Sequence, residues 1–264
     1  MSEPNLFGLN MFKIDDIVDH AAICMIAKRA SGKSYIVRDI LKKKNDISAA
    51  MVIAPTDKMS GFYDEFIPSI YIHYEYESQK LTQLFHRQKI LIQKNKDRAK
   101  EGKVLIDTRV ILVMDDCLAD KKSWMKDKNI AELLQNGRHY HITFILTMQY
   151  ALGITPELRS NFDYIFLLGE DFNNNKKKLY DHYAGMFPSY DIFAQVFQQV
   201  TVAYESMVLN NRVKSANIGE KVFWFKADMP KGGFQNGETI STIIMTSTTT
   251  LNGTRESRLW SSTT

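Results

Sequence analysis

Six short apolar runs, separated by longer segments of helical character, constrain the fold of this 264-residue chain more than any other feature. Most of the runs are continuously apolar, which is typical of strands covered on both faces. Strands that alternate with helical segments predict a parallel sheet with crossover helices. The runs are residues 21–27, 49–54, 70–74, 110–114, 142–148 and 164–168. We therefore predict an α/β protein with a mostly parallel central sheet and helices on both faces.

The segment AKRASGKS follows the first apolar run and opens a segment with helical apolar spacing. In such a loop the backbone N–H groups and the helix N-terminus face phosphates, and glycine lets the backbone approach them closely. A lysine then neutralises phosphate charge and a serine hydroxyl binds Mg²⁺. The sequence predicts an ATP site with Mg²⁺ at Ser34, formed by Ala27, Lys28, Arg29, Ala30, Ser31, Gly32, Lys33, Ser34 and Tyr35.

The loop departs from the usual pattern GxxxxGK(S/T) at its first residue, where Ala27 replaces glycine. Alanine is compatible with that position if its φ is negative, because only a left-handed backbone there requires glycine. The remaining SGKS is intact. We therefore expect a working site, with a decayed one as the alternative.

Two adjacent acids follow the apolar run that ends at Met114. A phosphate-binding loop needs a carboxylate at the end of a neighbouring strand to hold Mg²⁺, and a base to orient the attacking water. We assign Asp115 to the metal and Asp116 to the catalytic base. The alternative is a pair of solvated acids at a strand end.

Three more side chains are candidates for catalysis. Gln149 ends the next apolar run, where an amide can sense the γ-phosphate or position the water. Arg138 precedes that run and Arg159 follows it. Either guanidinium could reach the nucleotide of a neighbouring subunit and stabilise charge on the transferring phosphoryl group, or could form structural ion pairs instead.

The ends of the chain differ in composition from its middle. We expect an N-terminal extension over residues 1–11, one ATPase domain over 12–228 and a Ser/Thr-rich segment over 229–264 that is either a mobile tail or a partner-binding extension. The helical segment 78–103 has a lysine-rich distal half that fits either a solvated surface or a DNA-facing helix. A net charge of +4 permits a polyanionic partner without requiring one.

Cellular location is indicated by what the sequence contains and lacks. The two cysteines, Cys24 and Cys117, fall in or beside apolar runs, so we expect reduced core thiols of an intracellular protein. The N-terminus has no signal-peptide pattern, and no apolar run approaches the length of a membrane span. We expect a soluble protein.

In their order and spacing, ASGKS, the apolar run into DDC, NGRH before a strand ending in MQ, and LRSNFDYIFLL carry a family resemblance. Over residues 12–228 the chain resembles the genome-packaging ATPases of the nucleocytoplasmic large DNA viruses, the poxvirus-type members of the FtsK-HerA clan. The resemblance implies a RecA-like P-loop NTPase that binds ATP and Mg²⁺. Lys33 and Ser34 match its Walker A motif, Asp115 and Asp116 its Walker B pair.

By the same resemblance Gln149 matches the sensor glutamine and Arg138 the arginine finger. Many relatives have glutamate where this chain has Asp116. The resemblance further implies a homo-oligomeric ring that moves double-stranded viral DNA into a preformed capsid, with capsid or vertex proteins as partners. Its location would be the host cytoplasm, in the viral factory, with the virion as a second place.

Two other readings stay open. The first is another DNA-translocating or helicase-type P-loop NTPase. The second, from a different class, is an ATP-binding assembly scaffold with little or no hydrolysis, for which Ala27 would be a sign of decay. ATP hydrolysis with and without double-stranded DNA, measured for the native chain and for Lys33→Ala and Asp116→Asn, tests the motor and separates an enzyme from the scaffold.

Overall fold

The structure is a computed structural model that describes residues 8–47, 49–117 and 127–228. Its centre is an eight-stranded sheet with the order β3-β2-β4-β5-β1-β6-β7-β8. The strands are β1 Ala22–Ile26, β2 Ala50–Ile53, β3 Ile72–His73, β4 Val110–Asp115, β5 Ile142–Met148, β6 Tyr164–Leu168, β7 Glu205–Asn210 and β8 Val222–Lys226. All pairs from β3 to β6 are parallel, whereas β6 with β7 and β7 with β8 are antiparallel. The predicted α/β class and mostly parallel sheet are confirmed.

The six predicted strands all form, and β7 and β8 were not predicted. The strands β1, β2, β4, β5 and β6 are apolar except at Asp115, Thr143 and Thr147, and they are buried along their whole length. This burial is expected for strands that have helices on both sides.

The helices are α1 Lys33–Lys43, α2 Ser78–Lys100, α4 Lys128–Asn136, α5 Pro156–Arg159, α6 Asn173–Tyr183 and α7 Tyr190–Val200. Side-chain caps mark two of their starts: Asp127 accepts from the N–H of Asn129 before α4, and Ser189 accepts from that of Ile192 before α7. Such caps satisfy N–H groups that have no partner within the helix. The helix predicted after AKRASGKS is α1, which buries Val37 and Ile40 but leaves Tyr35 exposed.

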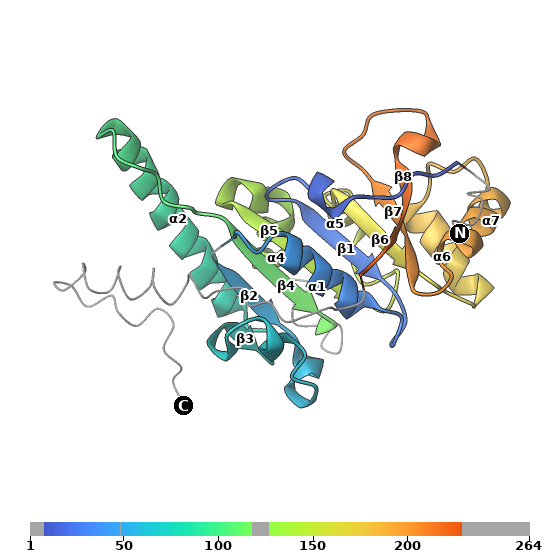
Figure 1. Cartoon of the computed structure of the whole chain (residues 1–264), viewed down its shortest axis with the longest axis horizontal. Coiled ribbons are helices and arrows are strands. Elements are labelled where there is room, and N and C mark those ends of the chain that lie inside the picture. Colours follow the sequence, from blue (N-terminus) through green and yellow to red (C-terminus); the bar gives the residue numbers. More distant parts are fainter. Residues whose placement is uncertain (1–7, 48, 118–126, 229–264) are drawn as a thin grey trace.

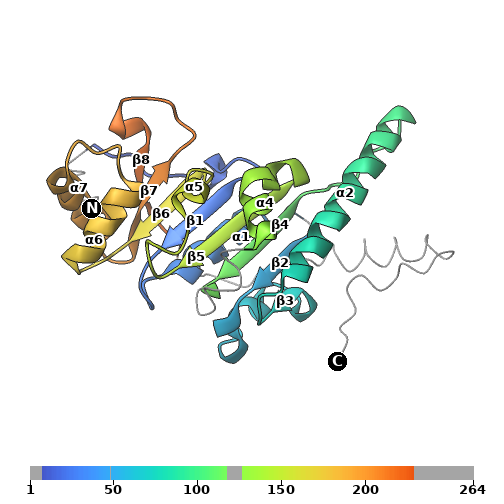
Figure 2. The same ribbon diagram turned by 180° about the vertical axis from the view of Figure 1, so that it is seen from behind.

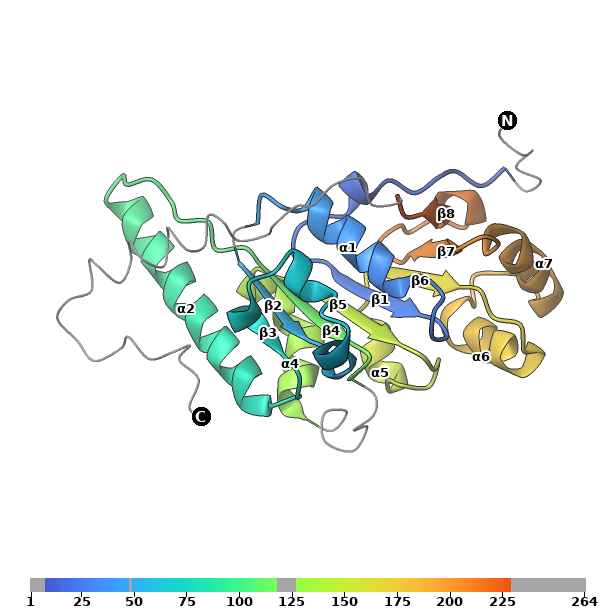
Figure 3. The same cartoon turned by 60° about the horizontal axis from the view of Figure 1, so that its bottom comes forward.

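The sheet separates two hydrophobic cores. Alternate residues of β1 point to opposite faces, so Cys24 packs with α2, α4, α6 and α7, whereas Met25 packs with α1. Short 3-10 turns, among them Tyr63–Glu65, complete the α1 face. Figure 3 shows the sheet between α1 on one side and α4 and α6 on the other. This confirms the prediction of helices on both faces. Both cysteines are buried thiols outside any disulfide.

Two features extend from this three-layer body. The distal half of α2 projects beyond the sheet, as Figures 1 and 2 show from opposite sides. At the other end of the sheet, residues before β1 pack on β8, where Phe12 N–H donates to the Trp224 carbonyl at 2.8 Å. Residues 1–7 of the expected extension and the whole expected tail, 229–264, lie outside the described residues. Among the helices of the described residues, none has the length and the apolar composition that crossing a membrane requires.

Candidate active site

The carboxyl ends of β1, β4 and β5 meet at one edge of the sheet, because these neighbouring strands are parallel. The loop of residues 27–32 leaves β1 at this edge and leads directly into α1. Asp115 ends β4, and Gln149 follows β5. The topology thus brings together the predicted loop, acids and glutamine, which are spread between residues 27 and 149 of the sequence.

Ala27 continues the sheet where the usual pattern has glycine. Its N–H donates to the Met148 carbonyl at 3.0 Å, and its side chain is buried in the α1 core. It is absent from the described non-glycine residues that have positive φ. Alanine therefore fits this position without strain, and glycine is not required.

The loop turns at two left-handed residues. Gly32 has φ 95° and ψ 7° and occupies the N-cap of α1, and Ala30 has φ 59°. Glycine takes the left-handed conformation readily, whereas alanine does so at a cost. The turn leaves the N-terminus of α1 facing outward at the edge of the sheet, as an anion site requires.

Lys33 lies inside the loop. Its ammonium donates to the carbonyls of Ala27 at 2.7 Å and Lys28 at 2.9 Å, and the residue is only 8% exposed. Burial lowers its pKa, while the nearby carboxylates of Asp116 and Asp115 act in the opposite direction. The positive charge is thus bonded to neutral groups and remains directed at the space within the loop.

The other predicted loop residues have less buried positions. Ser31 donates its hydroxyl to the Lys28 carbonyl at 2.5 Å, which closes the loop. Arg29 is exposed, and Ser34 is half-buried as the second residue of α1. Tyr35 is 48% exposed and its ring meets that of Phe62 edge-on at 6.1 Å. These placements leave Ser34 at the helix start, where its hydroxyl can face phosphate-bound Mg²⁺.

Asp115 is held by two hydroxyl groups. Tyr63 donates to one carboxylate oxygen at 2.8 Å, and Thr147 of β5 donates to the other. Burial raises the pKa of Asp115, whereas these hydrogen bonds and Lys33 favour the ionised form. The donors fix the orientation of a carboxylate that is 7% exposed.

Asp116 is fixed through its backbone and its side chain. Its φ is 51°, its N–H donates to the hydroxyl of Thr147 at 3.1 Å, and its carboxylate accepts from the amide of Gln149. Thr147 thus orders both acids. Asp116 and Gln149, which were both expected at the site for separate reasons, are thus hydrogen-bonded to each other.

The donor set fits Mg²⁺. Mg²⁺ prefers oxygen ligands and in nucleotide sites is held by one or two protein oxygens together with phosphates and water. Ser34 at the start of α1 and Asp115 at the end of β4 supply oxygens of that kind. The described residues contain no group of three or more His, Cys, Asp or Glu that could hold a metal by themselves.

A cavity of about 160 Å³ lies beside the loop, towards α6. Ala27, Gln149 and Glu170 contribute to its lining. Lys28 forms ion pairs with Glu170 at 2.8 Å and Asp171 at 3.0 Å, and these acids raise its pKa. The ammonium of Lys28 is therefore neutralised within the chain, unlike that of Lys33.

Neither of the two predicted arginines, Arg138 and Arg159, lies beside Lys33 at the carboxyl edge of the sheet. Arg138 is exposed in the 3-10 turn Gly137–Tyr140, before β5, and so lies at the opposite edge of the sheet. Arg159 ends α5, donates to the Ile154 carbonyl at 2.8 Å and lies over the ring of Tyr183 at 5.6 Å. Arg138 is available to a neighbouring molecule, whereas Arg159 is engaged within its own chain.

Sequence reasoning missed Tyr63 and Thr147. Thr147 is the polar residue in an otherwise apolar strand end, and a buried hydroxyl needs a partner, so its presence was a usable signal. Tyr63 comes from a turn 52 residues before Asp115 in the sequence. Nothing local in the sequence links that turn to the acids.

The fold and the loop define a P-loop NTPase of the RecA-like class. The chain belongs to the family described as poxvirus A32 protein, which matches residues 11–176. This membership confirms the resemblance to the poxvirus-type packaging ATPases inferred from the sequence.

Viral proteins of similar length resemble this chain. The uncharacterized protein L437 of Acanthamoeba polyphaga mimivirus is 49% identical over 230 residues, covering 87% of this chain and 81% of the relative. The uncharacterized protein 088R of Invertebrate iridescent virus 3 is 34% identical over 206 residues, covering 78% and 75%. The shared region therefore includes most of the described chain.

Solved structures share the fold at low sequence identity. The genome packaging NTPase B204 of Sulfolobus turreted icosahedral virus 2, in complex with AMPPCP, has a TM-score of 0.52 and 14% identity, covering 80% of this chain and 99% of that one. EssC (ATPases 2 and 3) from Geobacillus thermodenitrificans has a TM-score of 0.52 and 12% identity, covering 81% and 41%. These likenesses confirm the predicted P-loop ATPase fold.

Proposed function

We propose that this protein is an ATP-hydrolysing motor that moves double-stranded viral DNA into a preformed capsid during virion assembly. The observation that carries the proposal is the meeting of Lys33, Asp115, Asp116 and Gln149 at one edge of the sheet. Membership of the poxvirus A32 family and the fold shared with a viral genome packaging NTPase support it.

Each group at the edge has a distinct task in phosphoryl transfer. The backbone N–H groups before α1 and the ammonium of Lys33 bind the β- and γ-phosphates. Ser34 and Asp115 would hold Mg²⁺, which would supply neutralisation of the charge on the phosphate oxygens. The carboxylate of Asp116 accepts the proton of the attacking water, and the amide of Gln149 keeps that carboxylate in place.

Asp116 is one methylene shorter than the glutamate that many relatives carry. A general base must come within hydrogen-bond reach of the proton it removes. The left-handed backbone of Asp116 and its hydrogen bonds with Thr147 and Gln149 keep the shorter side chain in one orientation. The fixed orientation offsets the shorter length of the side chain. Aspartate in place of glutamate therefore changes how fast ATP is hydrolysed, and not whether it is hydrolysed.

A homo-oligomeric ring would complete the site. Arg138 is exposed at the edge opposite its own phosphate loop, so it can act only on a second subunit. A head-to-tail contact places one edge of a subunit against a different surface of the next and closes into a ring. Mixing Arg138→Ala subunits with Asp116→Asn subunits should restore part of the hydrolysis; no recovery would contradict a role in trans.

DNA would be held through its phosphates. The distal half of α2 and the turn after it carry Lys94, Lys96, Arg98, Lys100 and Lys103. Lysine and arginine contacts to phosphate give binding that is independent of sequence and sensitive to salt. We assign this projecting segment as a DNA contact, and capsid or vertex proteins of the viral factory as further partners.

The decisive experiment measures ATP hydrolysis with and without double-stranded DNA. We expect DNA to stimulate the native chain and expect no hydrolysis above background in Lys33→Ala. The matched control is Asp107→Asn, which changes an acid at the opposite edge. Absence of stimulation by DNA would contradict the motor, and equal rates in the native chain and Lys33→Ala would contradict the enzyme.

A further inference from the structure

The turn before β7 lies against the phosphate loop. Because β7 is antiparallel to β6, with Leu168 opposite Ser206, the turn of residues 201–204 falls at the carboxyl edge. A Cβ on Gly32 would lie 3.6 Å from the ring of Tyr204, which is ordinary van der Waals contact. A segment far along the chain therefore adds a wall to the loop.

The backbone of this turn is strained. Ala203 has φ 50° and Tyr204 has φ 66°, so two consecutive residues with side chains are left-handed. The N–H of Glu205 donates to the Val202 carbonyl at 2.9 Å, and Glu205 forms an ion pair with Lys226 of β8 at 3.2 Å. Strain of this kind persists only where the surroundings impose it, and it gathers at ligand sites.

The strained turn presents an aromatic ring to solvent. Tyr204 is 71% exposed, and within residues 8–47, 49–117 and 127–228 no aromatic ring packs on it. Tyr35, near the start of α1, is instead packed edge-on against Phe62. Among the described residues, the ring faces of Tyr204 are thus not covered by another aromatic ring.

We propose that the base of the bound nucleotide stacks on Tyr204, an inference that rests on the proposed nucleotide site. A nucleotide with its phosphates before the loop N–H groups would extend its nucleoside across the rim of the loop, where the ring of Tyr204 lies beside Gly32. Every base has a π-face, so this contact adds affinity for any nucleoside triphosphate and discriminates little between bases. Tyr204 is thus a ligand-binding residue and takes no part in proton transfer.

The test compares a ligand that has a base with one that has none. Binding of AMPPCP and of inorganic tripolyphosphate to the full chain is measured by calorimetry for the native protein, Tyr204→Asn and Tyr204→Phe. Asparagine tolerates a left-handed backbone but removes the ring. The matched control is Val202→Ala, at an exposed position of the same turn.

We expect Tyr204→Asn to weaken AMPPCP binding by about fivefold or more and to leave tripolyphosphate binding unchanged. Tyr204→Phe and Val202→Ala should bind both ligands as the native chain does. An unchanged affinity for AMPPCP in Tyr204→Asn, or an equal loss for both ligands, would overturn the inference while leaving the nucleotide site intact. A native chain that binds neither ligand would contradict the proposed function itself.

Discussion

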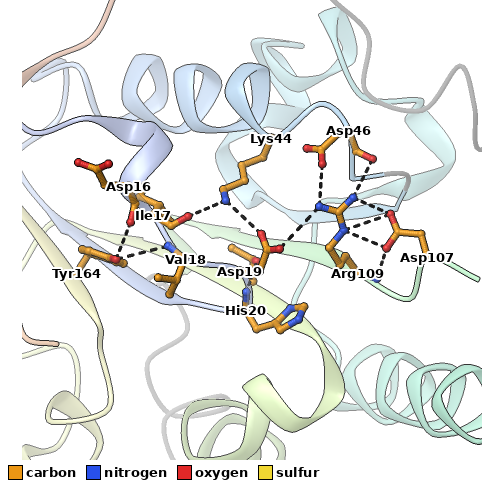
Figure 4. Close-up of polar contacts among 11 residues, drawn as sticks. Asp16, Ile17, Val18, Asp19, His20, Lys44, Asp46, Asp107, Arg109 and Tyr164 are labelled. Carbon is orange, nitrogen blue, oxygen red and sulfur yellow. Dashed lines mark hydrogen bonds and ion pairs between the residues drawn. The ribbon is translucent and has the colours of Figure 1, made fainter. Parts of the chain in front are cut away.

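The two edges of the parallel sheet use charged side chains in opposite ways. At the amino edge, Arg109 is surrounded by Asp46 at 2.7 Å, Asp107 at 3.0 Å and Asp19 at 3.8 Å (Figure 4). At the carboxyl edge, Lys33 bonds to main-chain carbonyls and, among the described residues, forms no ion pair with a carboxylate. The charge of Arg109 is neutralised inside the chain, whereas that of Lys33 is available for the phosphate that we propose it binds.

The acids show the same contrast. Burial acts to raise the pKa of Asp107, but its bonds with Arg109 hold that pKa below the usual value. Asp115 is held by hydroxyls, and burial keeps its pKa above the usual value. Asp107 and Arg109 neutralise each other and contribute to stability. Among the described residues, the carboxylate of Asp115 accepts hydrogen bonds from neutral hydroxyls only, so its charge is still available to a ligand.

Backbone strain also distinguishes the edges. Four of the described non-glycine residues with positive φ, Ala30, Asp116, Ala203 and Tyr204, lie at the carboxyl edge around the loop. The other two, His20 and His141, stack at 4.8 Å at the amino edge. Strain gathers where the site must be ordered in advance.

The largest predicted effect separates two acids. Asp116→Asn removes the base, so the rate of ATP hydrolysis should fall by about 10²–10⁴-fold, as measured by phosphate release. Asp107→Asn at the amino edge should retain the native rate. If Asp116→Asn hydrolyses ATP within a few-fold of the native rate, Asp116 is not the general base.

The next effect compares two buried threonines of β5. Thr147→Val removes the hydroxyl that orders Asp115 and Asp116, and the hydrolysis rate should fall by about 10–100-fold. Thr143→Val removes an acceptor of the His20 N–H at the other end of the same strand. It should lower the free energy of unfolding by about 1 kcal/mol and leave the rate unchanged. Equal hydrolysis rates in Thr147→Val and Thr143→Val would contradict a role of Thr147 in the site.

Arg109→Ala should affect stability alone. Three carboxylates lose their shared partner, and solvent screening of the exposed ones limits the loss of unfolding free energy to about 1–2 kcal/mol. Urea denaturation measures the loss, and hydrolysis per folded molecule should match the native value. A fall in hydrolysis would show that the edges are coupled.

The smallest effect depends on pH. Burial lowers the pKa of His20 from 6.5, His141 and Arg109 lower it further, and Asp19 opposes them. Because the pKa of His20 is lower in the folded than in the unfolded chain, the unfolded chain binds a proton more readily. The free energy of unfolding is therefore unaffected by His20 above about pH 6.5 and declines as the pH falls below it. His20→Asn, which suits the left-handed backbone, should reduce this decline by less than about 1.4 kcal/mol. Urea denaturation at about pH 7.5 and about pH 5.5 measures it, with the exposed His139→Asn as control; equal declines would contradict the assignment.

The sequence was sufficient where the signal is local. Continuous apolar runs predicted the six parallel strands, and strand-end positions predicted that Lys33, Asp115, Asp116 and Gln149 would meet. Tyr63 and Tyr204 reach the site from segments that are distant along the chain, and no periodicity or motif connects them to it. The missed strands β7 and β8 pair antiparallel at the sheet edge, outside the βαβ rhythm on which the prediction rested.

Our central claim is that the carboxyl edge binds the nucleotide and the amino edge only stabilises the fold. Ligand-induced stabilisation tests this claim most directly. A ligand that binds only the folded state raises its stability by RT ln(1 + [L]/Kd), so the shift in Tm reports binding. With AMPPCP and Mg²⁺ in excess, we predict that Arg109→Ala, although less stable, gains the same shift as the native chain, and that Lys33→Ala gains none. A native-sized shift in Lys33→Ala, or its loss in Arg109→Ala, would contradict the account.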